Sequence, residues 1–188
     1  MGLTPCAVQR IDRILEAVWL EGRRTLFEHE VYAILETVGL GVPRHRFVRE
    51  IDEADSEAVA GLGRHLVAKI VSPGIPHKQK VGGVKRIAAT DPLYVQYVLA
   101  RMETEVRRHF PPGDPPAVAG FLLVEYVPHK QAIGYETLLG FREDSAFGPI
   151  LAVSKGGEDA EFFAAHYDPA NLFLPPVAYS EILAFLRT

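Results

Sequence analysis

The sequence predicts a mixed α/β protein, because helical and strand-like patterns alternate along a chain of ordinary globular composition. Apolar residues recur every three or four positions at 8–19 and again at 31–38, which is the spacing of amphipathic helices. Runs rich in branched apolar residues occupy 66–71 and 120–127, which is typical of β-strands. The chain has 188 residues, of which 48% are apolar and 23% charged, so it can form a hydrophobic core. We therefore expect an α/β (α+β) protein with one ordinary domain or two small lobes.

Two helices and a short strand are expected in the N-terminal part of the chain. Gly22 follows the first apolar pattern, so the first twenty or so residues form one helix. The second pattern ends at the glycine- and proline-containing segment 39–43, which leaves 45–48 free to extend as a strand. Asp55 or Ser56 is expected to cap a third, short helix.

The strand candidate at 66–71 contains a lysine, and the sequence Ser72-Pro73-Gly74 ends the run. A buried ammonium group is costly unless it is paired or contacts a phosphate, which makes Lys69 a candidate ligand for an anion. Strand alternation also allows Lys69 to face solvent while Ala68 and Ile70 face inward. Lys69 by itself therefore leaves both interpretations open.

The second half of the chain continues the alternation of helices and strands. Asp91 and Pro92 provide an N-cap and a first-turn proline for a long helix, and the proline-rich segment 111–116 breaks it. Four further elements are expected, namely strands at 120–127, 133–141 and 149–153 and a final short helix around 182–186.

The composition excludes several classes of protein. The formal net charge is −4, whereas nucleic-acid-binding proteins usually carry a surplus of positive charge. The apolar runs are far too short to cross a bilayer, and the N-terminus does not resemble an export signal. The single cysteine, Cys6, cannot form an internal disulfide. We therefore expect a cytoplasmic protein with no nucleic-acid or membrane partner, in which any anion site is local.

The densest chemical signal is the segment 72–86, which places four cationic side chains and His77 around the pair Gly82-Gly83. Glycines let the backbone approach a phosphate closely, and lysines supply the countercharge. A solvated hairpin with ordinary surface lysines has the same composition. His77 is a candidate phosphoryl acceptor, because an imidazole nitrogen is a good nucleophile at neutral pH and nearby lysines would stabilise the dianion.

The remaining titratable residues give weaker signals. The other six histidines show no spacing of a metal triad or an acid–base pair. Carboxylates on or beside the later strand candidates could contact an adenosine or hold magnesium, although solvated strand-end carboxylates are commoner. These carboxylates are Glu125, Glu136, Asp144 and Glu161.

A series of short motifs follows one order along the chain. The motifs are Lys69, Ser72-Pro73, His77-Lys78, Gly82-Gly83-Val84, Gly134-Tyr135-Glu136, Phe147-Gly148-Pro149, Gly156-Gly157, Glu161 and Pro175-Pro176. Together they resemble the ATP-grasp domain of ADP-forming acyl-CoA synthetases such as acetate-CoA ligase, over about 26–177. The resemblance implies an ATP-grasp fold, incomplete here, with two lobes around a nucleotide cleft. It assigns 1–24 to an N-terminal helix, 25–118 to the small lobe and 119–188 to the start of a truncated second lobe.

The resemblance also implies an activity, that of an acid–thiol ligase completed by a missing part or a partner subunit. In that family the strand lysine contacts nucleotide phosphates and the histidine is transiently phosphorylated, so His77 is the expected relay. The expected cofactors are ATP or ADP and Mg²⁺, and the expected partner is the CoA-binding domain or subunit of the same synthetase. The implied nucleotide and phosphate contacts are Lys69, Ser72, Lys78, Gly82, Gly83, Glu125 and Glu136, with Glu161 for the metal.

The sequence departs from the family pattern in three places. Gln79-Lys80 stands where the family usually has Ser-Asp, and Ser154-Lys155 stands where it has Gly-Leu before a diglycine. The only asparagine, Asn171, does not stand in the acidic-x-Asn-Pro sequence that completes the magnesium shell in the family. These departures leave open a non-catalytic ATP-grasp-like binding or regulatory module. A third possibility is an interaction subunit whose basic loop docks on an acidic partner.

Overall fold

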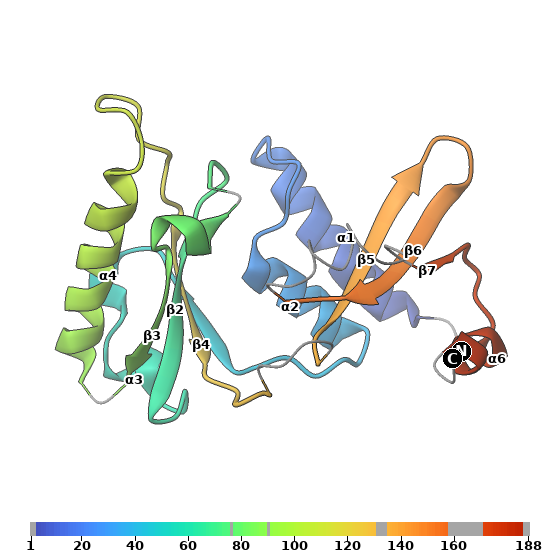
Figure 1. Ribbon diagram of the computed structural model, residues 1–188, viewed down its shortest axis with the longest axis horizontal. Coiled ribbons are helices and arrows are strands. Elements are labelled where there is room, and N and C mark those ends of the chain that lie inside the picture. The colour runs from blue at the N-terminus through green and yellow to red at the C-terminus, as the bar shows by residue number, and fades with distance from the viewer. Residues whose placement is uncertain (1–2, 76, 90, 131–134, 158–170, 186–188) are drawn as a thin grey trace. The chain divides into compact units, whose positions relative to one another are not determined.

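The computed structural model describes residues 3–75, 77–89, 91–130, 135–157 and 171–185. It divides into two units, Met1–Val127 and Pro128–Thr188, and each contains an antiparallel sheet with helices (Figure 1). The predicted α/β class is therefore confirmed. No helix within the described residues is long and apolar enough to cross a membrane.

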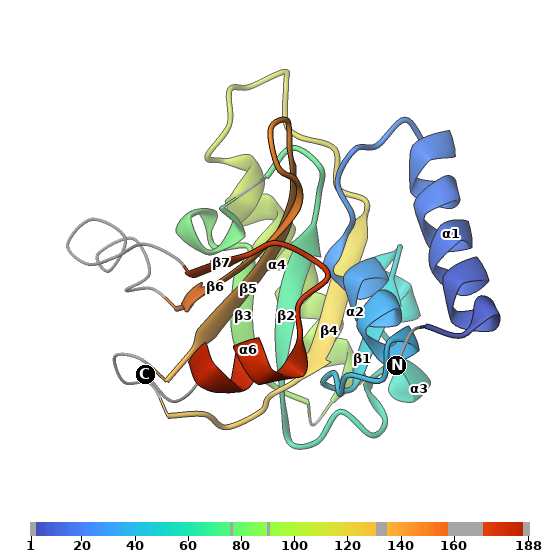
Figure 2. The same cartoon turned by 90° about the vertical axis from the view of Figure 1, so that its right-hand side faces the viewer.

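A four-stranded antiparallel sheet forms the centre of the first unit. Its strands are arranged in the order β1 (His45–Val48), β4 (Gly120–Glu125), β2 (His65–Val71) and β3 (Val84–Ala88), as Figure 2 shows. Strand β4 forms hydrogen bonds to both β1 and β2, so the first and last strands of the unit are neighbours in the sheet. The strands that the sequence predicted at 45–48, 66–71 and 120–127 are all present.

Helices pack on both faces of this sheet (Figure 1). On one face, α4 (Pro92–Arg107) buries Val95, Leu99, Met102 and Val106 in the larger core cluster. On the other face, Phe27 and Tyr32 from the start of α2 (Glu28–Thr37) pack against a smaller cluster of Val71, Leu122 and Val124. Helix α1 (Pro5–Leu20) packs against α2. Two short helical turns, η1 (Ile51–Glu53) and α3 (Ser56–Val59), follow β1.

Side-chain caps define where several helices begin. The Asp91 carboxylate accepts a hydrogen bond from the Leu93 amide at 2.9 Å, as expected for the cap of α4. Of the two cap candidates for α3, Asp55 is the cap, and it accepts bonds from the amides of Glu57 and Ala58. Such caps satisfy amides that have no partner within the helix.

The basic segment after β2 contains two elements that the sequence did not predict. A 3₁₀ turn, η2 (Lys78–Val81), ends at Gly82, whose φ of 77° is a left-handed conformation. Strand β3 then begins at Val84 and runs along the edge of the sheet. Only Ile87 of this strand is buried, so it lacks the apolar alternation by which strands are predicted.

The second unit contains a three-stranded antiparallel sheet in the order β5 (Thr137–Asp144), β6 (Gly148–Lys155) and β7 (Asn171–Phe173), followed by α6 (Tyr179–Phe185). Two of these strands and the helix correspond to expected elements, although part of the strand expected at 133–141 lies outside the described residues. Strand β7 was not expected. The predicted lobes at 1–24, 25–118 and 119–188 stay a prediction. The two units of the structure divide after Val127, and β4 belongs to the sheet of the first unit.

Candidate functional site

Lys69 lies in β2 on the face of the sheet that α2 covers. It pairs with Leu122 of β4, and paired residues of antiparallel strands share one face. Leu122 belongs to the core cluster against which α2 packs. On that face the Lys69 Nζ donates a hydrogen bond to Oε1 of Glu28 at 2.5 Å. The two side chains are 24% and 27% exposed, so Lys69 is neither fully buried nor a free lysine on the solvent face.

Glu28 holds together a small group of polar side chains. Its Oε1 also accepts a hydrogen bond from the Tyr32 hydroxyl at 2.5 Å. Burial by itself raises the pKa of Glu28, but the hydrogen bond and charge of Lys69, together with the effects of Tyr32 and Lys78, lower it below its ordinary value. Burial and the bond to Glu28 raise the pKa of Tyr32. Glu28 is therefore an ionised carboxylate at neutral pH.

Lys78 is the second cation of this group. Burial lowers the pKa of Lys78, and the positive charge of Lys69 lowers it further, while the negative charge of Glu28 opposes both effects. Two ammonium groups thus lie near one carboxylate, and the three side chains carry a net positive charge. Such a group can attract an anion to this face of the sheet.

The packing of η2 on the sheet explains why Gly83 lies close behind this turn. The Gly83 amide donates to the Lys78 carbonyl at 2.7 Å, and the Gly83 carbonyl accepts from the Ile70 amide at 2.8 Å. A Cβ on Gly83 would lie 2.6 Å from Cγ2 of Ile70, so no larger residue fits without movement. The glycine thus lets the basic turn pack directly on β2. His77 precedes this turn and its side chain is exposed.

Ser72 is buried at the end of β2, with 6% of its surface exposed. Its hydroxyl accepts a hydrogen bond from the Gly74 amide at 3.2 Å. In this structure Ser72 therefore stabilises the turn that leads from the strand to His77.

Two of the predicted carboxylates, Glu125 and Glu136, have partners of their own among the described residues. Glu125 is held at the end of β4 by Arg44, whose amide and guanidinium donate to it at 2.8 and 2.6 Å. The bond from the Arg44 amide, followed by the bond from its guanidinium, lowers the pKa of Glu125. Glu136 belongs to the second unit and lies 3.7 Å from Nε2 of His129. Glu161 lies outside the described residues.

The described residues fit a phosphate group better than a metal ion. Within the described ranges, no three His, Cys, Asp or Glu side chains are grouped so that they could hold a metal. The magnesium prediction rests on Glu161 and is not tested by this part of the chain. By contrast, Lys69 and Lys78 are the donor types that bind phosphate.

Sequence reasoning missed Glu28, Tyr32 and Arg44. Glu28 lies 41 residues before Lys69, and only the packing of α2 on the sheet brings them together. The available signal was weak, namely a strand lysine that needs a partner and an acidic first turn in α2, with two short helical turns and a strand between them.

Comparison with known proteins gives consistent matches. A family model described as an ATP-grasp domain matches residues 17–187. The acetate–CoA ligase (ADP-forming) I subunit beta of Pyrococcus furiosus is 28% identical over 180 residues, which are 96% of this chain and 72% of that protein. The 4-hydroxybutyrate–CoA ligase (ADP-forming) of Nitrosopumilus maritimus is 29% identical over 148 residues, which are 79% of this chain but only 20% of that ligase.

A solved structure agrees with these relatives. Acetyl-coenzyme A synthetase 1 of Ca. Korarchaeum cryptofilum, in complex with coenzyme A and Ca-AMPCP, superposes with a TM-score of 0.76 and 25% identity, over 93% of this chain and 71% of the solved chain. The predicted fold is therefore confirmed. Because the family model covers most of the sequence and the fold agrees, this chain belongs to the ATP-grasp domain family.

Proposed function

We propose that this chain is the nucleotide-binding portion of an ADP-forming acyl-CoA synthetase, which catalyses acid + CoA + ATP = acyl-CoA + ADP + phosphate. In this proposal Lys69 and Lys78 bind nucleotide phosphates and His77 carries the phosphoryl group. The CoA-binding domain or subunit of the same synthetase supplies the acyl and CoA sites, and Mg²⁺ accompanies the nucleotide. Further nucleotide contacts, carried over from the family, are Ser72, Gly82, Gly83, Glu125 and Glu136, with Glu161 for the metal.

One observation carries the proposal, namely that Lys69 is held by Glu28 on the α2 face of the sheet, while Lys78, which follows the exposed His77, is close enough to interact electrostatically with both side chains. Phosphoryl transfer depends mainly on positioning and charge neutralisation, which this group supplies. A ring nitrogen of His77 would attack the γ-phosphorus of ATP with its lone pair. The bond from that phosphorus to the bridging oxygen would break, and ADP would leave with the oxygen.

The first experiment compares the thermal unfolding midpoint with and without Mg-ADP or Mg-ATP. A ligand at a hundredfold excess over its dissociation constant stabilises the folded state by about 2.7 kcal/mol, which raises the midpoint of a chain this size by roughly 5–10 °C. We expect this shift in the wild type and in Lys85→Ala, and a much smaller shift in Lys69→Ala, in which binding is weakened but still measurable. Lys85 is a matched control, because it is also a strand lysine paired with a helix glutamate, Glu105. If millimolar nucleotide causes no shift in the wild type, the chain has no working nucleotide site of its own.

A second experiment separates the synthetase from a non-catalytic ATP-grasp-like binding module, which the substitutions Gln79-Lys80 and Lys155 favour. The chain is incubated with ATP labelled at the γ-phosphate, and acid-labile, alkali-stable label on the protein is measured. The synthetase proposal predicts label in the wild type and none in His77→Asn. Nucleotide binding without label would favour the binding module.

A further inference from the structure

The Lys69–Glu28 pair is a partly buried ion pair between the first sheet and α2. Oε1 of Glu28 accepts from Lys69 and from Tyr32, each at 2.5 Å. Bonds to an ionised acceptor are the stronger class of hydrogen bond. A lysine side chain has a flexible four-carbon stem, so this contact restricts where its ammonium group lies.

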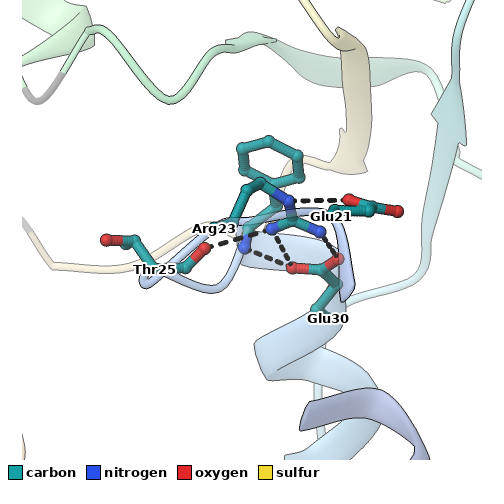
Figure 3. A network of polar contacts seen from close by, with 5 residues as sticks. Glu21, Arg23, Thr25 and Glu30 are labelled. Carbon is teal, nitrogen blue, oxygen red and sulfur yellow. Dashed lines mark hydrogen bonds and ion pairs between the residues drawn. The ribbon is translucent and has the colours of Figure 1, made fainter. Parts of the chain in front are cut away.

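The first turn of α2, which carries Glu28, is held in place by a network of polar contacts (Figure 3). Arg23 donates two hydrogen bonds to the Glu30 carboxylate, at 2.9 and 2.5 Å. The same carboxylate accepts the Phe27 amide at 2.6 Å, and the Arg23 guanidinium stacks 4.0 Å from the centre of the Phe27 ring. Arg23 and Glu30 are only 13% and 16% exposed. The first turn of α2, which carries Glu28, is therefore fixed on both sides of that residue.

We propose that Glu28 is a positioning residue that holds the Lys69 ammonium group ready for a nucleotide phosphate, an inference that rests on the proposed function. Protein kinases use the same arrangement, in which a helix glutamate pairs with the strand lysine that binds the nucleotide. An ammonium group that is already ordered loses less freedom when a phosphate binds.

An opposing effect makes this proposal testable. Removing Glu28 also removes a negative charge near the phosphate, and by simple electrostatics that removal strengthens nucleotide binding. If positioning dominates, the variant binds more weakly. If charge repulsion dominates, it binds more tightly, and Glu28 is then only a competitor for Lys69.

The test measures the dissociation constant of Mg-ADP by calorimetry on the full chain. We expect Glu28→Gln to weaken binding by about five- to tenfold, since ordering one flexible side chain is worth about that much. The control Glu105→Gln, which changes the α4 residue that pairs with Lys85, should bind Mg-ADP within about twofold of the wild type. Tyr32→Phe removes only the second bond to Glu28 and should have a smaller effect of the same sign.

A double-mutant cycle excludes a purely structural role for Glu28. In the Lys69→Ala background, Glu28→Gln should no longer weaken Mg-ADP binding, because there is no ammonium group to position. A second readout needs no nucleotide: chemical acylation of Lys69, measured by mass spectrometry, should be several-fold faster in Glu28→Gln, while acylation of Lys78 changes less. If Glu28→Gln binds Mg-ADP as tightly as a wild type that binds, the inference is overturned and the proposed function stands. If the wild type does not bind nucleotide, both fail.

Discussion

At the scale of single residues, Gly83 shows how a missing side chain shapes the candidate site. A Cβ at this position would lie 2.6 Å from Cγ2 of Ile70 and 3.0 Å from the Lys78 carbonyl oxygen. We therefore expect Gly83→Ala to lower the free energy of unfolding by about 1–3 kcal/mol, the usual cost of overpacking. Chemical denaturation followed by circular dichroism measures the change.

Gly41→Ala is the matched control for this prediction. A Cβ at Gly41 would have nothing within 4 Å, and its φ is not left-handed. Its free energy of unfolding should stay within about 0.5 kcal/mol of the wild type. Equal effects of the two substitutions would show that η2 is not packed on Ile70 as described.

His29 gives a prediction about pH. Its ring stacks 4.1 Å from that of Phe47, and its Nδ1 is buried with no hydrogen-bond partner among the described residues. Burial lowers the pKa of His29 below its usual 6.5, against an opposing effect of Glu30. The neutral ring therefore favours the folded state, and that contribution is present above pH 6.5 and lost as the pH falls through the lowered pKa.

We accordingly expect His29→Phe to lose less stability than the wild type when the pH falls from 7.5 to 5. Removing an unsatisfied buried nitrogen should leave stability at pH 7.5 equal or higher. Thermal midpoints measured across this range test the prediction. His65→Gln, at an exposed position, should change with pH in parallel with the wild type. Parallel curves for all three proteins would contradict the burial of a neutral His29.

At the scale of elements, helix α2 connects the core to the site. Arg23 and Glu30 fix its first turn, and breaking a poorly exposed ion pair leaves one charge without its partner. We expect Arg23→Gln to lower the free energy of unfolding by roughly 1–3 kcal/mol. The neighbouring Arg24 is exposed, so Arg24→Gln should lie within about 0.5 kcal/mol of the wild type.

The Arg23–Glu30 pair also predicts how the stability of the fold changes at acidic pH. Burial by itself raises the pKa of Glu30, but the bonds from Arg23 and the Phe27 amide outweigh burial and lower it below 4.5. This contribution to stability is present above the unfolded pKa and lost as the pH falls through the folded value. The wild type should therefore lose stability below about pH 4.5, and Arg23→Gln should lose less over the same interval. If both proteins lose the same amount of stability below about pH 4.5, the role given to Arg23 is contradicted.

The elements that could be predicted from sequence are those with local signals. Helices α1, α2 and α4 have apolar residues at helical spacing, and Asp91 and Pro92 mark the start of α4. Strand β3 and the turn η2 have no such signal, because their residues are mostly polar and β3 lies at a sheet edge. Lys69 was recognised as a candidate from its apolar strand, but its partner Glu28 depends on tertiary packing and could not be read from the sequence.

At the scale of the whole chain, the proposed site residues are unevenly distributed. Lys69, His77 and Lys78 all belong to Met1–Val127, together with both sheet faces and the helices that cover them. Glu136 belongs to the second unit. The chain spans only about a fifth of the larger ligases that it matches, so the full synthetase reaction remains a proposal for a longer or multi-subunit protein.

The division of the core leads to a prediction about folding. Among the described residues, every buried hydrophobic side chain except Ile150 lies in Met1–Val127. In the second unit, Phe141, Phe147 and Tyr179 are 69%, 67% and 75% exposed. Burial of apolar surface drives folding, and a piece of about 60 residues with so many exposed aromatic side chains is at best marginally stable. We expect residues 1–127 alone to unfold cooperatively, with a midpoint within about 5 °C of the full chain, and residues 128–188 alone to show no cooperative transition. Circular dichroism melts and amide chemical-shift dispersion of the two pieces test this.

A cooperative melt of 128–188 would mean that its strands form a core without the first unit. An unfolded 1–127 would mean that the larger sheet needs the second unit to form.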